Sequence, residues 1–120
     1  MKQYYTGALD KYKTIIETIE DFTTLTRRSR TIISGRIYFI DSTFLEIYDR
    51  WHNDKLERYN YYWLDGDTVI MGWDNIEHHR EIATFPHHKH TKHKKEVLCS
   101  YEKTLADVLA VINNHLHVND

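Results

Sequence analysis

The sequence of 120 residues has few of the features that make linkers, covalent cross-links or membrane spans. One proline and four glycines argue against a linker or a low-complexity arm. The one cysteine, Cys99, cannot form an internal disulfide, so we expect a reducing, cytoplasmic location. No apolar run approaches the roughly 20 residues that cross a bilayer, and the first residues have no apolar signal core. We therefore expect no membrane association and a single domain over residues 1–120.

Aromatic and histidine side chains, by contrast, are abundant. Nine tyrosines, four phenylalanines and three tryptophans allow a short chain to bury a large area. The formal net charge of −2, with nine neutral histidines, is not that of a general polyanion binder. Residues 85–95, however, contain four lysines, four histidines and no acid. This basic segment has two interpretations, a contact to a phosphate backbone or a solvated loop.

The hydrophobic pattern predicts an α+β domain. Apolar residues at helical spacing predict an amphipathic helix over residues 7–20, and a second helix begins at Thr104, where Thr104 and Asp107 resemble a capping box. Residues 31–40, 43–51, 56–64 and 68–73 have the composition and alternation of strands, and residues 96–99 suit a short edge strand. We expect an antiparallel β-meander of four to six strands, covered by an N-terminal and a C-terminal helix.

The segment from Trp73 to His93 concentrates the side chains that can do chemistry. In one interpretation, two of its histidines act as the acid and the base in RNA cleavage that needs no cofactor, and a nearby cation stabilises the phosphorane. Alternation in an extended segment would place His88 and His90 on one side and Lys89 on the other. The candidate catalytic residues are His78, His79, His87, His88, His90, Asp74 and Arg58. The candidate nucleic-acid-binding residues are Arg80, Lys89, Lys92, Lys94 and Lys95.

Two other interpretations of this segment stay open. His88, His90 and Asp74 are residue types that bind a divalent transition metal such as zinc. Alternatively, the histidines are structural and bond backbone groups in an irregular loop. For Arg58 we expect a position on the strand next to Asp74 and an ion pair with it. The neighbouring Tyr59, Tyr61, Tyr62 and Trp63 would divide between core packing and base stacking.

The histidine-rich segment contains Trp-Asp-Asn-x-x-His-His from Trp73, followed by Phe-Pro-His-His-Lys-His from Phe85. These two blocks are the specific part of a resemblance to the TumE family of prokaryotic toxin–antitoxin systems. The resemblance extends over most of the chain, including the 35–37 strand and the last helix. It departs after His90, where this sequence has more lysines. The matched motif positions are Asp74, Asn75, His78, His79, Pro86, His87, His88 and His90.

The resemblance implies a small toxin whose partner is a helix-turn-helix antitoxin, and it assigns no catalytic residue. Since small bacterial toxins commonly target translation, RNA is the expected target by analogy, and the toxin would be either a ribonuclease or an RNA binder. The alternative is a non-enzymatic module that uses the histidine-rich loop to bind a protein or a metal. An edge strand could also pair two copies into a homodimer.

Overall fold

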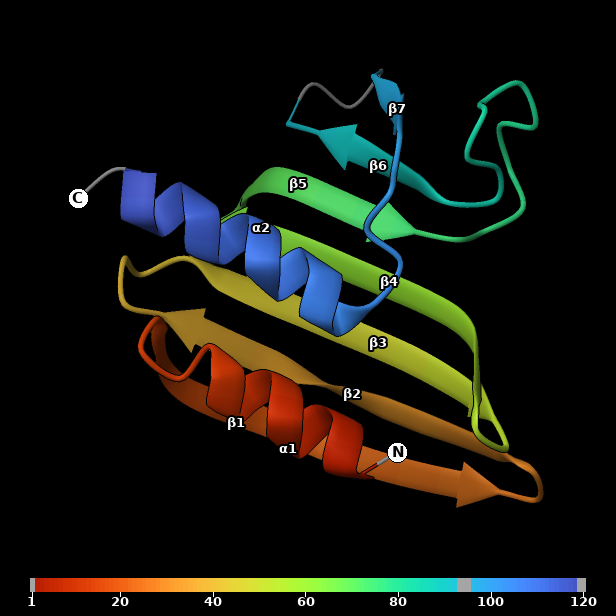
Figure 1. Ribbon diagram of the computed structural model, residues 1–120, viewed down its shortest axis with the longest axis horizontal. Helices are drawn as coiled ribbons and strands as arrows, with labels where there is room; N and C mark the ends of the chain where they lie inside the picture. Colours follow the sequence, from red (N-terminus) through yellow and green to blue (C-terminus); the bar gives the residue numbers. More distant parts are fainter. Residues whose placement is uncertain (1, 93–95, 119–120) are drawn as a thin grey trace.

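Each strand of the sheet pairs with the strand next to it in sequence (Figure 1). This computed structural model describes residues 2–92 and 96–118, and within them it shows an α+β fold with one seven-stranded antiparallel sheet. The elements are α1 (Lys2–Lys11), β1 (Ile16–Arg27), β2 (Arg30–Phe39), β3 (Phe44–His52), β4 (Lys55–Asp65), β5 (Thr68–Asp74), β6 (His88–Thr91), β7 (Val97–Cys99) and α2 (Leu105–Val118). The prediction of an antiparallel meander with one helix before it and one after it in the sequence is therefore confirmed.

The first helix begins and ends earlier than predicted, and the expectation of one helix over residues 7–20 is wrong. α1 ends at Lys11, and Ile16 begins β1, which pairs with β2 as far as Arg27. Residues 16–27 are rich in isoleucine and threonine, whose branched Cβ atoms fit a pleated strand better than a helix. The helix-like apolar spacing thus runs through a helix, a turn and a strand. β1, which was hidden in this spacing, and β6, which lies in the histidine-rich segment, were not among the predicted strands, so the expected four to six strands become seven.

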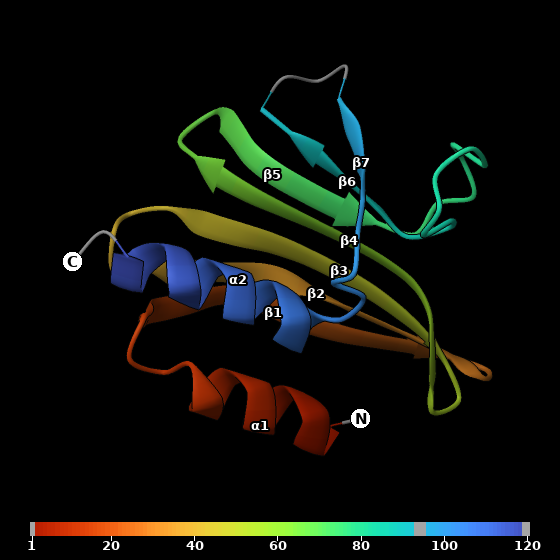
Figure 2. The ribbon, with the colours of Figure 1, turned by 45° about the horizontal axis from the view of Figure 1, so that its top comes forward.

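Both helices lie on the same face of the sheet (Figure 2). The apolar side chains of α2 are buried there, namely Leu105, Val108, Leu109, Ile112 and Leu116. Thr104 caps this helix by accepting a hydrogen bond from the backbone N–H of Asp107 (3.2 Å), as the predicted capping box requires. Tyr61 and Trp73 are fully buried in the core. α1 covers the part of the sheet nearer β1. No described helix covers the opposite side, which we call the outer face. Neither helix, as far as the described residues go, is long and apolar enough to span a membrane.

A buried carboxylate ties α1 to the middle of the sheet. Asp49 of β3 accepts hydrogen bonds from the hydroxyls of Tyr5 in α1 and Tyr61 in β4. The hydroxyl of Tyr5 in turn accepts one from the indole N–H of Trp51 at 2.9 Å. Burial raises the pKa of Asp49 to about 6, although the two tyrosine donors act against that shift. The position of α1 therefore depends on a polar network inside an otherwise apolar core.

The Asp49→Asn variant should change how stability depends on pH. The folded-state pKa of about 6 lies above the ordinary value of 3.8, so the folded protein binds this proton more tightly. The resulting stabilisation is complete below the ordinary pKa and is lost as the pH rises through about 6. Between pH 4 and 7, the free energy of unfolding of the wild type should fall by about 2–3 kcal/mol relative to the variant. Urea unfolding at each pH measures this, and parallel profiles would contradict it.

Candidate functional site

The pairing of β4, β5 and β6 places polar residues from three strands in one row. Asn60 of β4 lies opposite Asp74 of β5, and Asp74 lies opposite His88 of β6. Cross-strand partners point to the same side of a sheet, and this side is the outer face, because the adjacent Trp73 faces the core. The register therefore brings an amide, a carboxylate and an imidazole together from residues 60, 74 and 88.

A second row runs beside the first. Tyr62 lies opposite Gly72, and Gly72 lies opposite His90. His88 and His90 share the outer face, while Lys89 between them turns to the helix side and forms an ion pair with Glu102 at 3.1 Å. The predicted alternation along this strand is confirmed.

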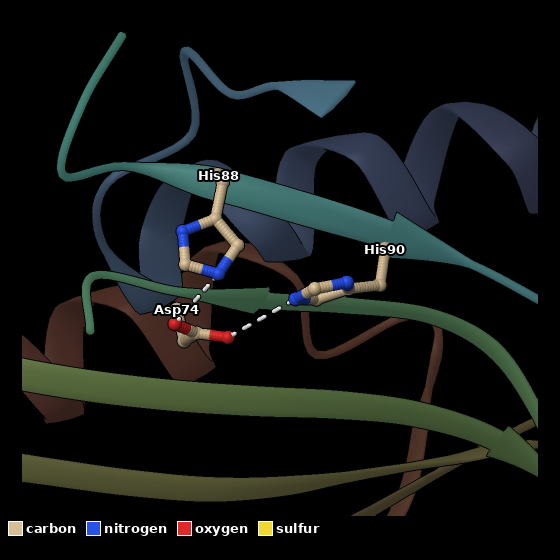
Figure 3. A group of neighbouring side chains, drawn as sticks. All are labelled: Asp74, His88 and His90. Atoms are coloured by element: carbon tan, nitrogen blue, oxygen red, sulfur yellow. Dashed lines mark ion pairs between the residues drawn. The ribbon is translucent and has the colours of Figure 1, made fainter. Parts of the chain in front are cut away.

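Both histidines of β6 point their Nε2 atoms at one carboxylate (Figure 3). The Nε2 atom of His88 lies 3.0 Å from Oδ1 of Asp74, and the Nε2 atom of His90 lies 3.5 Å from Oδ2. Asp74 and His88 are almost completely buried, whereas the side chain of His90 is 27% exposed. Burial lowers the pKa of His90, and the neighbouring His88 adds to this shift. The group thus has two buried members and one that reaches the surface.

The loop between β5 and β6 fixes the buried pair. The Nδ1 atom of His88 lies 3.0 Å from the carbonyl oxygen of Pro86, and Oδ1 of Asp74 accepts a hydrogen bond from the backbone N–H of Ile76 (2.9 Å). A carbonyl oxygen is only an acceptor, so Nδ1 of His88 carries a proton and donates it. The same loop brings His79 over the strand, with its ring centre 5.4 Å from that of His88.

Four side chains therefore form what we call the histidine cluster, namely Asp74, His79, His88 and His90. His79 has a half-exposed side chain, and its Nδ1 atom lies 3.5 Å from a carboxylate oxygen of Glu81. Next to the cluster, Oδ1 of Asn60 is buried and, in the described part of the chain, has no hydrogen-bond partner. A buried acceptor without a donor is costly, and such atoms are uncommon in folded proteins.

A pocket opens beside His90 on the outer face. It has a volume of about 240 Å³ and is lined by Tyr62, Val69, His90 and Thr91. Gly72 lies between Tyr62 and His90, and a Cβ atom at this position would lie only 2.9 Å from the tyrosine ring. The absence of a side chain therefore lets the Tyr62 ring lie close to the strand. A larger pocket of about 390 Å³ lies between α1 and the first strands, but its lining, which includes Leu9 and Phe22, holds no histidine.

Arg58 lies on the outer face, but the predicted ion pair between Arg58 and Asp74 is wrong. Asp74 pairs in register with Asn60, and both of its oxygens already face imidazoles. Arg30 and Arg50 both form ion pairs with Glu57, and Arg36 forms one with Glu46. Arg58 has no ion pair among the residues that the structure describes, so its charge is free to meet a ligand.

The remaining predicted residues lie apart from the cluster or at its rim. His87 is on the helix side, where its Nδ1 atom lies 2.9 Å from the hydroxyl of Tyr59, and burial together with Lys103 lowers its pKa. His78 is exposed next to His79, and the guanidinium of Arg80 lies over the ring of Phe85 (5.6 Å). Lys92 is exposed after β6, and Lys94 and Lys95 lie outside the described residues.

The sequence alone did not single out Asn60 or Gly72. Neither residue belongs to a recognisable motif, and their importance comes from the partners that the register gives them. Tyr62 was recognised only as one of four aromatic candidates, and burial now separates it from the other three. Tyr59, Tyr61 and Trp63 are buried in the core, whereas Tyr62 is 38% exposed.

Comparison with known proteins gives one result. The family model described as Toxin TumE matches residues 7–116, which is nearly the whole chain. No curated protein and no solved structure shows significant similarity to this chain.

The His88→Ala variant should destabilise the fold far more than loss of an exposed histidine. It leaves the buried carboxylate of Asp74 without its 3.0 Å partner, a change that costs about 3–5 kcal/mol in buried ion pairs. His52→Ala, at the exposed end of β3, should change the free energy of unfolding by less than about 0.5 kcal/mol. Urea unfolding of both variants measures the difference. Equal effects would mean that the pair does not stabilise the fold.

Proposed function

This chain belongs to the TumE toxin family and is thus the toxin of a toxin–antitoxin system; we propose that it acts on RNA, binding a single-stranded segment on the outer face and cleaving it at the histidine cluster. The observation that carries this proposal is the pocket in which the half-exposed ring of Tyr62 lies beside His90. An aromatic surface next to imidazoles is what a single-stranded substrate needs, because bases stack on rings while the phosphate reaches the reactive groups.

The architecture of the sheet supports binding on this side. The helices occupy the other face, so an extended strand of RNA has an open surface to lie on (Figure 2). Arg58 is two residues from Asn60 on β4, which corresponds to about 6.6 Å along a strand. Because Arg58 lacks an ion pair within the described chain, a phosphate there would gain a charge-assisted contact without breaking one.

The reaction that fits the cluster is attack of the ribose 2′-hydroxyl on the adjacent 3′-phosphodiester. The hydroxyl loses its proton to the Asp74, His88 and His90 group, O2′ bonds to phosphorus, and the P–O5′ bond breaks. His79, with a side chain that is 37% exposed, is the imidazole placed to return a proton to O5′. The products are a 2′,3′-cyclic phosphate and a free 5′-hydroxyl, and no further reactant is consumed.

The family implies an antitoxin partner. Its helix-turn-helix type and the pairing of two toxin copies into a homodimer stay predictions. The sheet offers β1 and β7 as its edges, and β1 is the longer, with most of its residues exposed. A long exposed edge presents backbone groups that another chain can pair with.

Tyr62→Ala should weaken RNA binding and cleavage while the protein stays folded. Loss of one stacking ring costs about 1–3 kcal/mol, which corresponds to roughly a 5- to 150-fold loss of affinity for single-stranded RNA. Tyr101→Ala is the matched control, because Tyr101 is 74% exposed and does not line the pocket. RNA affinity of the purified proteins, and growth with total RNA integrity after induction in a bacterial host, are the measurements. Equal behaviour of the two variants would argue against stacking on Tyr62.

Arg58→Gln should reduce the salt dependence of RNA binding. Loss of one phosphate contact to a single strand lowers the slope of log K against log salt concentration by about 0.7. Arg28→Gln is the control, since Arg28 lies exposed in the β1–β2 turn, away from the histidine cluster. An unchanged slope for Arg58→Gln would mean that Arg58 does not contact an RNA phosphate.

A further inference from the structure

We propose that Asp74, His88 and His90 bind one divalent transition metal ion of the zinc class, with Oδ of the carboxylate and Nε2 of each imidazole as ligands. The binding claim rests on the geometry of these side chains. The part of the metal in RNA cleavage rests in addition on the proposed function.

The spacing of the three side chains matches that of metal ligands. Their ligand atoms all lie within 4.8 Å of one another, and the two closest imidazole–carboxylate distances are 3.0 and 3.5 Å. Ligand atoms bound tetrahedrally at about 2.0–2.1 Å from zinc are about 3.3 Å apart. Small side-chain adjustments would therefore bring the three ligand atoms to zinc-binding distances without moving the strands.

The hydrogen bond of His88 prepares its ring for a metal. Because Nδ1 donates to the carbonyl of Pro86, Nε2 is the ring atom of His88 that is left to bind a metal, and it is the atom that faces Asp74. Metal-binding histidines usually donate their other ring N–H to a carbonyl or a carboxylate in this way.

The strands hold the three ligands rigidly and leave one side open. His88 and His90 are two residues apart on β6, so both point to the face where β5 presents Asp74 (Figure 3). Two ligands are buried, and His90 reaches the pocket beside Tyr62. Three protein ligands with an accessible fourth position are typical of catalytic zinc sites, whereas structural sites have four protein ligands.

Two side chains beside the three ligands are compatible with a metal ion that has a bound water. The buried Oδ1 of Asn60, directly opposite Asp74, has no donor in the described chain, and metal-bound water is a strong donor. His79 packs against His88 but contributes no ligand atom to the three-residue group. A metal here would provide a hydroxide as the acceptor for the 2′-hydroxyl proton and a positive charge beside the phosphate.

The test is direct metal binding by untagged protein, since a histidine tag would bind the same ions. After a chelator has stripped the wild type, titration calorimetry with Zn²⁺ should give one ion per chain, and Co²⁺ should give the visible absorption of low-coordinate cobalt. His90→Ala should weaken Zn²⁺ binding more than about 100-fold, beyond the 10- to 100-fold that loss of an outer-shell partner costs. Because His90 is 27% exposed, this variant should keep the fold, which circular dichroism checks.

His52→Ala is the matched control and should bind Zn²⁺ as tightly as the wild type. Equal binding by the wild type and folded His90→Ala, or no binding of one ion per chain, would overturn the metal site in favour of a protonated ion pair. RNA cleavage is scored separately in the same preparations. Cleavage that persists in chelator without bound metal would refute the metal's part in cleavage and retain the nuclease, whereas tight metal binding with intact RNA would support the metal site and argue against the nuclease.

Discussion

The burial of the Asp74 carboxylate is the constraint on which the candidate site depends. A carboxylate that loses its water must gain positive charge or hydrogen-bond donors, and here β6 supplies two imidazoles at 3.0 and 3.5 Å. Those imidazoles reach it because β5 and β6 pair in one register, with residue 74 opposite residue 88. A shift of one residue would turn both histidines to the helix side. The pairing of two strands thus sets both the electrostatics and the chemistry of the site.

The two faces of the sheet divide the hydrophobic core from the candidate site. The helix side holds the aromatic core together with a second buried carboxylate, Asp49, whose tyrosine partners tie α1 to the strands. The outer face holds the histidine cluster, the ring of Tyr62 and the charge of Arg58, which forms no ion pair with any described residue. Because the helices leave this face open, a ligand can approach its polar groups without displacing the core.

Local patterns predicted most of the elements correctly, and the failure at residues 7–20 has a physical cause. Strand alternation and the cap at Thr104 are set by neighbouring residues, so the sequence reveals them. Around Ile15 the apolar side chains serve first a helix and then an edge strand. The helix and the strand pack apolar side chains against the same core, so the apolar spacing alone does not mark where the helix ends and the strand begins. The branched side chains after Ile16 were the signal that favoured a strand.

By itself, the sequence determined the family, the α+β class and the segment that carries the histidines, because these depend on motifs and on periodicity along the chain. Tertiary structure alone decided which of those histidines lie together. His87 and His88 are neighbours in sequence, yet they lie on opposite faces of the sheet because side chains alternate along the chain. Asn60, Asp74 and His88 are far apart in sequence and meet because cross-strand register is set by the pairing of whole strands.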